Sequence, residues 1–265
     1  MGELRDDWPV NFAHRGASAR APENTLEAFR LAVEAGAGGL ELDVHMTLDK
    51  EIVVIHDATV ERTTEGSGVV AEMKLDELRA LDAGYRFSPE GGRTHPYRGQ
   101  GLRIPTLAQV YEQFPAVCVN VDIKEPQPGA EEAVMRVIRD ARAEGRSLVV
   151  SGDHAVARRF RRVSGSRIST GASRLETGAF YLLSRLRLER LGLGRPACDA
   201  LQVPVEHKGV TLVTPRFLRA AHSRGVRVDA WTINDPHEMR RLLGLGVDVL
   251  MTDRPEKLTR VLGEL

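Results

Sequence analysis

Short apolar runs alternate with amphipathic stretches along most of this 265-residue chain, and this rhythm restricts the folds available to it. A strand followed by a helix, repeated many times, is typical of a parallel sheet covered by helices. Eight runs have the length and residue types of strands: Val10–Ala13, Gly39–Val44, Val117–Ile123, Ser147–Ser151, Arg167–Thr170, Ala200–Val203, Val226–Trp231 and Val247–Met251. Eight repeats in a chain of this length favour an α/β fold closed into a (β/α)8 TIM barrel over an open sheet.

Signals for helix ends lie between the predicted strands. Four pairs have the spacing of helix N-termini, as capping boxes or as an N-cap before proline: Asn24 with Glu27, Thr106 with Gln109, Thr214 with Pro215, and Asp235 with Pro236. Four glycines lie where helices should end before the next strand: Gly36, Gly145, Gly225 and Gly246.

Two stretches interrupt the alternation. Residues 58–105 are long for a loop, are rich in Gly, Arg and Thr, and include a helical piece at Lys74–Leu81. Because such connections usually carry function or form a small subdomain, we expect one domain over residues 1–265 with an insertion at about 58–105. Residues 171–199 contain a leucine- and arginine-rich pattern at Tyr181–Leu193. That pattern predicts a barrel helix with an exposed basic side, and the alternative is a lid or a weak membrane-surface contact.

Charge and composition argue against several classes of protein. Basic and acidic residues both number 37, whereas nucleic-acid-binding domains usually have a basic excess. No run approaches the roughly 18 apolar residues of a membrane span, and Met1–Val10 lacks the apolar core of a signal peptide. Cys118 and Cys198 are too few for a disulfide framework. We therefore expect a cytoplasmic protein without a nucleic-acid partner or a transmembrane segment, and the oligomeric state stays open.

Polar residues alternate with apolar ones in two predicted strands, which places the polar side chains on one face of each strand. These faces carry Glu41 and Asp43 in one strand, and Asn120, Asp122 and Lys124 in the other. In a barrel the apolar faces meet the helices, so the polar faces point inward near the C-terminal strand ends, where barrel active sites form. Charged groups in an interior normally filled by Val, Ile and Leu are unfavourable unless something compensates them.

A divalent cation would compensate these carboxylates. Glu41, Asp43 and Asp122 supply hard oxygen ligands that suit Mg²⁺ or Ca²⁺, with Mn²⁺ as a third candidate. The alternative is a buried salt-bridge network that joins the three carboxylates to Lys124 and Arg15.

Two histidines follow strand-like segments in the same way. His14 comes before Arg15 and Gly16, and His56 comes after the apolar run Ile52–Ile55. Each histidine alone is more often structural, but paired imidazoles serve as general base and general acid near neutral pH. Arg15 offers a planar fork for phosphate oxygens and Lys124 adds a point charge, so the set suits a phosphoryl group.

At these residues the sequence resembles the glycerophosphodiester phosphodiesterase family. The resemblance runs in order through most of the chain, which makes it far more specific than a lone His-Arg-Gly. The matching motifs are His14-Arg15-Gly16, Pro22-Glu23-Asn24-Thr25, Glu41-Leu42-Asp43, His56-Asp57, Asp122-Ile123-Lys124, Trp231-Thr232-Ile233-Asn234 and Gly246-Val247-Asp248.

The resemblance implies a role for each matching residue. Glu41, Asp43 and the acid at position 122 would bind the metal, and His14 and His56 would be the acid/base pair. Arg15 and Lys124 would hold the phosphate, Glu23 and Asn24 would shape the first loop, and Trp231 would line the substrate pocket. The insertion at 58–105 corresponds to one that the family has after its second strand region. The family usually has glutamate where this chain has Asp122, and the shorter arm makes that ligand less secure.

The activity implied is metal-dependent hydrolysis of a glycerophosphodiester to glycerol 3-phosphate and an alcohol. The attacking group is either water or the glycerol 2-hydroxyl. Two alternatives stay open: a phospholipase D-like hydrolase of lysophospholipids or sphingomyelin, and a non-catalytic barrel that binds a phosphorylated ligand. The leucines of 181–193 keep the lipid alternative open.

Overall fold

Eight parallel strands form the barrel that the sequence predicts. The computed structural model describes residues 8–124, 126–165, 167–186 and 197–265. Neighbouring strands pair in the order β6-β5-β4-β2-β1-β11-β10-β7, and each overlaps a predicted strand. Their bounds are β1 Asn11–His14, β2 Gly39–Met46, β4 Cys118–Ile123, β5 Ser147–Val150, β6 Ser169–Thr170, β7 Ala200–Pro204, β10 Arg227–Trp231 and β11 Val249–Thr252.

The barrel closes between β6 and β7, the two strands at the ends of this order. One parallel bridge joins Gly171 to Ala200, and the Asp199 amide donates to the Thr170 carbonyl at 2.8 Å. Three short strands lie outside the ring of eight. β3 (Ile52–Val54) pairs antiparallel with β2, and β8 (Glu206–His207) pairs with β9 (Val210–Thr211).

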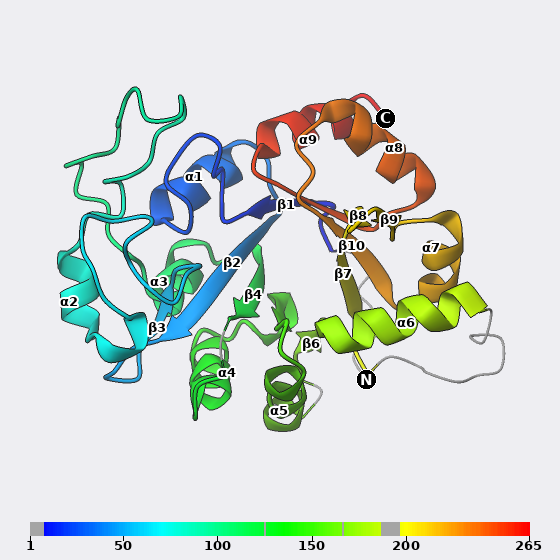
Figure 1. The fold of residues 1–265 in the computed structure, drawn as a ribbon, viewed down its shortest axis with the longest axis horizontal. Coiled ribbons are helices and arrows are strands. Elements are labelled where there is room, and N and C mark those ends of the chain that lie inside the picture. Colours follow the sequence, from blue (N-terminus) through cyan, green and yellow to red (C-terminus); the bar gives the residue numbers. More distant parts are fainter. Residues whose placement is uncertain (1–7, 125, 166, 187–196) are drawn as a thin grey trace.

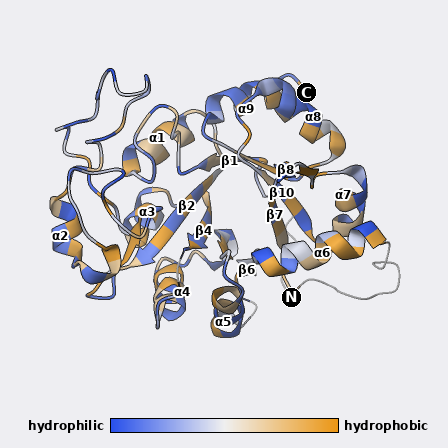
Figure 2. Cartoon of the chain, viewed as in Figure 1, coloured by the Kyte–Doolittle hydropathy of each residue, from blue (hydrophilic) through white to orange (hydrophobic). Residues whose placement is uncertain are grey.

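Helices surround the strands (Figure 1), each with a hydrophobic side and a hydrophilic side (Figure 2). Their bounds are α1 Leu26–Glu34, α2 Leu75–Ala80, α3 Leu107–Gln113, α4 Ala130–Asp140, α5 His154–Ser164, α6 Arg174–Leu186, α7 Pro215–His222, α8 Pro236–Leu245 and α9 Pro255–Gly263, with short 3₁₀ turns at Val70–Glu72 and Glu144–Arg146. In the described part of the chain, none of them has the length and apolar character needed to cross a membrane.

Three of the four predicted helix starts are confirmed. Thr106 and Gln109 form a capping box, and Thr214 and Asp235 cap helices that begin with proline. The fourth, a box formed by Asn24 and Glu27, is wrong by one residue. Thr25 is the N-cap of α1, with its side chain accepting from the Ala28 amide at 3.2 Å. Asn24 has a left-handed backbone, with φ of 57°, and its side chain turns toward the barrel mouth.

Three of the four predicted helix-ending glycines also have a left-handed backbone. The φ angles of Gly36, Gly225 and Gly246 are 86°, 65° and 91°. Gly145 is the exception, because it lies within the 3₁₀ turn Glu144–Arg146. The left-handed residue that follows α4 is Arg142, with φ of 50°, so the chain leaves that helix three residues earlier than predicted.

Residues 58–105 follow β3 and contain mostly irregular structure. The predicted helical piece is α2, and the segment has a hydrophobic cluster of its own, which includes Val60, Val70, Leu78 and Ile104. Two larger clusters fill the space between the barrel strands and the helices. The first gathers buried side chains between residues 13 and 168, and the second gathers those between 180 and 261.

A polar network crosses the barrel interior. Asn120 donates to Gln202 at 3.2 Å, Gln202 donates to Asp229 at 3.0 Å, and Arg227 Nε donates to Asp229 at 2.9 Å. Asp229 is fully buried, and burial raises the pKa of its carboxyl although Arg227 acts in the opposite direction. The Arg227 guanidinium in turn lies 4.2 Å from the centre of the Trp8 ring.

Replacement of Arg227 by methionine should destabilise the fold strongly. The variant would leave the Asp229 carboxylate buried without its cation, which costs about 3–5 kcal/mol when one partner of a buried pair is removed. Urea unfolding followed by circular dichroism measures the change. The control is Arg240→Met, because the Arg240–Glu264 pair is exposed and such pairs contribute about 0–1 kcal/mol. Equal losses in the two variants would contradict the role given to Arg227.

Candidate active site

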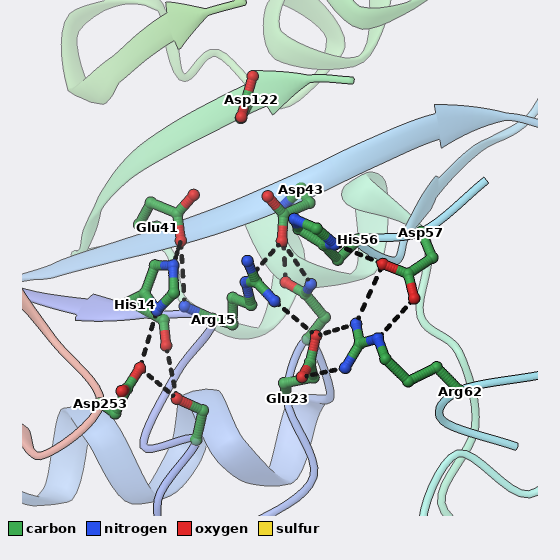
Figure 3. Close-up of polar contacts among 12 residues, drawn as sticks. His14, Arg15, Glu23, Glu41, Asp43, His56, Asp57, Arg62, Asp122 and Asp253 are labelled. Carbon is green, nitrogen blue, oxygen red and sulfur yellow. Dashed lines mark hydrogen bonds and ion pairs between the residues drawn. The ribbon is translucent and has the colours of Figure 1, made fainter. Parts of the chain in front are cut away.

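The C-terminal end of β1 and the neighbouring part of β2 bring together most of the predicted site residues (Figure 3). His14 is the last residue of β1 and lies opposite Glu41 of β2 in the parallel register. Asp43 is two residues further along β2 and lies opposite Asp122 of β4. The alternation of polar and apolar residues therefore places these side chains as the sequence predicts, inside the barrel and at one end of it.

His14 is held by a carboxylate that comes from the far end of the chain. Its Nδ1 lies 2.8 Å from Asp253 Oδ1, and its Nε2 lies 4.0 Å from Glu41 Oε2. Asp253 is oriented by hydrogen bonds from Ser18 Oγ at 2.9 Å and from Asn234 Nδ2 at 2.6 Å. Burial lowers the pKa of His14, but Glu41 and Asp253 outweigh it, so the pKa is raised. Because Asp253 can only accept, Nδ1 carries the proton and Nε2 is the nitrogen left for chemistry.

Asp43 has three partners in the site, and two of them are cations. Its oxygens lie 3.1 Å from Arg15 Nε and 2.6 Å from Lys124 Nζ, and Asn24 donates to it at 2.8 Å. Burial raises the pKa of Asp43, but the charges of Lys124 and Arg15 outweigh this and the pKa is lowered. Lys124 also lies 2.6 Å from Asp122. The ion pairs of the salt-bridge alternative are therefore present between these groups.

The three predicted metal ligands are neighbours but do not form a ligand cluster as they stand. In the parts of the chain that the structure describes, no three His, Cys, Asp or Glu side chains converge closely enough to hold a metal ion. Two of the predicted ligands, Asp43 and Asp122, both contact the ammonium group of Lys124, which occupies the place between their oxygens.

The chemistry of the carboxylates nevertheless fits a hard divalent cation. Burial and the charge of Asp43 raise the pKa of Glu41 to about 7, and burial raises the pKa of Asp122. Asp122 Oδ1 is buried and accepts no hydrogen bond from any described residue. A cation such as Mg²⁺ or Ca²⁺ would offset the unfavourable negative charge of these carboxylates. It would also provide a partner for the unsatisfied buried oxygen.

His56 is held in the same way as His14. Its Nδ1 lies 2.5 Å from Asp57 Oδ1, and Asp57 accepts from Arg62 Nε at 2.5 Å. Burial raises the pKa of Asp57, but Arg62 and His56 outweigh it and hold the pKa at about 2. Arg62 also donates from two nitrogens to Glu23, both at 2.8 Å, and Glu23 accepts from Arg15 at 3.0 Å. One arginine from the start of the insertion thus joins the partner of His56 to the partner of Arg15.

The last predicted site residue, Trp231, lies at the C-terminal end of β10. That strand is separated from β1 by β11, and 42% of the Trp231 side chain is exposed. It lies at the same end of the barrel as His14, and the structure shows no contact between the two among the described residues. Its role in substrate binding therefore stays a prediction.

Several residues of the site are not in the predicted set. Asp253 follows the last strand directly, and its position after a strand end is a signal that could have identified it. Asp57 and Asn234 belong to quoted motifs, but nothing in the sequence shows that they orient His56 and Asp253. Arg62 has no sequence signal, because its partners are brought together only by the path of the insertion.

Replacement of Arg62 by alanine should lower kcat by about 10- to 100-fold with a smaller change in KM, the loss typical when a group that orients a catalytic residue is removed. Asp57 would lose its cation and Glu23 would be held only by Arg15, so His56 and Arg15 would both be less firmly positioned. Arg62→Lys should recover only part of the loss, because lysine lacks the fork that binds two carboxylates.

The matched control for Arg62 is Arg93→Ala. Arg93 is exposed in the same insertion and has no ion pair with any described residue. Steady-state kinetics with added guanidinium tests the positioning role further, since it should partly rescue Arg62→Ala and leave Arg93→Ala unchanged. Identical kinetics for the two alanine variants would show that Arg62 does not position the site.

The fold and the site together define a class of protein, namely a TIM-barrel enzyme whose paired histidines, carboxylates and cations suit a phosphate ester. Residues 14–257 match the sequence model of the glycerophosphoryl diester phosphodiesterase family, and the chain belongs to that family. A glycerophosphodiester phosphodiesterase of Caldanaerobacter subterraneus subsp. tengcongensis is 35% identical over 93% of this chain and 94% of its own. The resemblance seen in the motifs and the class of enzyme it implies are thereby confirmed.

Solved structures and more distant relatives agree with this family. An Oleispira antarctica phosphodiesterase, solved in complex with the product sn-glycerol-3-phosphate, aligns with a TM-score of 0.74 at 26% identity. The alignment covers 98% of this chain and 99% of that one. A lysophospholipase D of Rattus norvegicus is 28% identical over 96% of this chain and 86% of its own.

Proposed function

We propose that this chain hydrolyses glycerophosphodiesters to sn-glycerol 3-phosphate and an alcohol in a reaction that depends on a divalent cation. The observation that carries the proposal is the matched pair of histidines. His14 and His56 each contact a carboxylate through Nδ1, at 2.8 Å and 2.5 Å, and His14 lies beside Glu41 while His56 lies beside Asp43 (Figure 3). Two imidazoles fixed in this way can act from opposite sides of one phosphoryl group.

Each residue of the site has a separate role in the proposed reaction. Arg15 and Lys124 bind the phosphate oxygens and offset the charge that grows there. One histidine takes the proton of the attacking hydroxyl through Nε2, and the other gives a proton to the departing alkoxide. The attacking hydroxyl belongs either to water or to the glycerol 2-position. Glu41, Asp43 and Asp122 would hold the cation, which supplies further positive charge against the phosphoryl group.

The experiment that tests this proposal measures release of sn-glycerol 3-phosphate from glycerophosphocholine, coupled to glycerol-3-phosphate dehydrogenase. Mg²⁺, Ca²⁺ and Mn²⁺ are supplied in separate assays. Release with at least one of these cations is the expected result. Absence of release with all three would overturn the proposal.

A second candidate is phospholipase D-like hydrolysis of a lysophospholipid or sphingomyelin. The observation that favours it is the row of exposed leucines on α6, which gives an acyl chain an apolar surface to contact. Lysophosphatidylcholine and sphingomyelin, assayed beside glycerophosphocholine, separate the two candidates. Faster turnover of an acylated substrate would favour the lipid activity. Membership of an enzyme family does not favour the non-catalytic alternative.

We also infer that residues 1–265 act as one domain in the cytoplasm, with 58–105 as an insertion that supports the site through Arg62. The two cysteines, Cys118 and Cys198, are too few for a disulfide framework, which agrees with a reducing compartment. The predicted features at Met1–Val10 and Tyr181–Leu193 lie partly outside the described residues, which omit 1–7 and 187–196.

A further inference from the structure

Arginine is concentrated on three consecutive helices of the barrel. We call α5, α6 and α7 together the arginine face, since α6 contacts both of the others along one side of the molecule (Figure 1). These helices contain eight arginines and one acidic residue, Glu176. The whole chain has equal numbers of basic and acidic residues. The basic excess of this face is therefore offset by an acidic excess elsewhere on the molecule.

Most of these arginines have no carboxylate partner. Arg159 pairs with Glu131 at 2.8 Å and Arg161 pairs with Glu176 at 2.5 Å. Among the residues that the structure describes, the other six form no ion pair: Arg158, Arg162, Arg174, Arg185, Arg216 and Arg219. Within the described part of the chain no carboxylate offsets these six charges, so an external anion can bind them.

An apolar stripe lies on the solvent side of α6, between these arginines. Leu175, Leu182 and Leu186 are 64%, 61% and 66% exposed, and their spacing places them along one side of the helix. The opposite side of α6 is already packed, with the Phe180 ring against Phe217 at 5.4 Å between centroids. Single exposed leucines are ordinary, but a row of them on one helix marks a surface that contacts something apolar.

A groove lies between α5 and α6. It is open to solvent, has a volume of about 400 Å³, and is lined by His154, Arg158, Arg161, Arg162, Glu176 and Ala197. Arg158 and Arg162 bring two unpaired guanidinium groups to it. Guanidinium groups bind phosphate oxygens through two parallel hydrogen bonds, so a phosphodiester headgroup suits this groove.

We propose that the arginine face docks on a membrane surface that contains anionic phospholipid. The leucine stripe of α6 enters the boundary between headgroups and acyl chains, and the surrounding arginines bind lipid phosphates. The charge pattern selects this partner over a second copy of the chain, because a two-fold interface would set arginine against arginine. The exposed leucines favour a membrane over nucleic acid, because a phosphate backbone offers them no apolar surface to contact.

Docking on this face has a consequence for the substrate. The N-terminal ends of α5 and α6 follow the C-terminal ends of β5 and β6, so they lie at the barrel end that holds His14 and Glu41. A molecule docked through these helices keeps its active-site mouth beside the bilayer. This consequence rests on the proposed activity, whereas the docking itself does not.

The test is flotation of the purified full chain with vesicles of phosphatidylcholine alone and of phosphatidylcholine mixed with phosphatidylglycerol. The expected result is binding to the mixed vesicles, weakened by salt, and little binding to the neutral ones. The double variant Arg158→Ala/Arg162→Ala should lower the partition coefficient by about thirtyfold, because each arginine near the surface contributes a factor of about five. Leu182→Ser/Leu186→Ser should lower it as well.

Matched controls come from the rest of the surface. Leu48 is 52% exposed, and Arg93 is exposed in the insertion, so Leu48→Ser and Arg93→Ala should bind vesicles like the wild type. Activity on water-soluble glycerophosphocholine checks that each variant is folded and should be unchanged. Absent binding to mixed vesicles, equal binding to neutral vesicles, or binding to RNA without binding to vesicles would each overturn the proposal, whatever the outcome of the activity assays.

Discussion

Replacement of His14 by alanine is expected to lower kcat for release of sn-glycerol 3-phosphate by about 10²–10⁴-fold, with little change in KM. The His14 imidazole is held by Asp253 at 2.8 Å, and its pKa is raised because Glu41 and Asp253 outweigh the effect of burial. Arg15 and Lys124 remain in the variant, so substrate binding is largely retained. His56→Ala should cause a loss of similar size.

The matched control is His222→Ala. His222 also pairs with a carboxylate, at 2.8 Å from Asp248, but it lies on the C-terminal turn of α7, away from the β1 and β2 ends. Its loss should leave kcat within about twofold, since surface substitutions rarely change more than local stability. If His14→Ala and His222→Ala had the same kcat, His14 would have no part in proton transfer.

Removal of divalent cations should have the second large effect, a fall of activity to background that is reversed when Mg²⁺, Ca²⁺ or Mn²⁺ is added back. Glu41, Asp43 and Asp122 provide hard oxygen ligands whose negative charge is only partly offset by Lys124 and Arg15. Asp43→Asn should weaken cation binding, because it removes the charge of a carboxylate that is two residues from Glu41 on β2 and opposite Asp122 of β4. Activity that survives exhaustive chelation would contradict cation dependence.

Cation binding should also depend on pH. The pKa of Glu41 is raised to about 7 without a cation, so this carboxyl is protonated below that pH and ionised above it. Only the ionised form is a good ligand, so affinity should fall as the pH drops below 7, and the number of protons released for each ion bound should rise toward one. Calorimetric titration of the His14→Ala variant in buffers of different ionisation enthalpy measures the number of protons released.

Asp122→Glu, which restores the longer side chain usual in the family, should bind the cation at least as tightly as the wild type. The same calorimetric titration measures this affinity.

The sequence predicts the barrel well because its signals are local and consistent. Each parallel strand is a short apolar run followed by a helix with an identifiable start, as at Thr214 and Asp235. The errors occur where backbone conformation depends on distant groups. Asn24 has the residue type and spacing of an N-cap, but it forms a hydrogen bond with Asp43, nineteen residues away, and Thr25 caps the helix instead.

The site is predicted less completely for a related physical reason. Side chains on one strand face can be placed from periodicity alone, which identified Glu41 and Asp43. The groups that orient the histidines come from other parts of the chain, and no local pattern connects Arg62 with Glu23 or Asp253 with His14. The contact of Lys124 with Asp43 likewise follows from pairing of β2 with β4, which the sequence does not specify.

The pairing of His14 with Asp253 also has a consequence for synthesis of the protein. The two residues are 239 positions apart, and each belongs to a different end of the chain. During translation, His14 and the residues of the first hydrophobic cluster are synthesised early. Asp253, the carboxylate that orients His14, is synthesised only after the last strand. A translation product that stops before β11 therefore contains both histidines and all three candidate metal ligands, yet lacks the group that fixes the His14 tautomer.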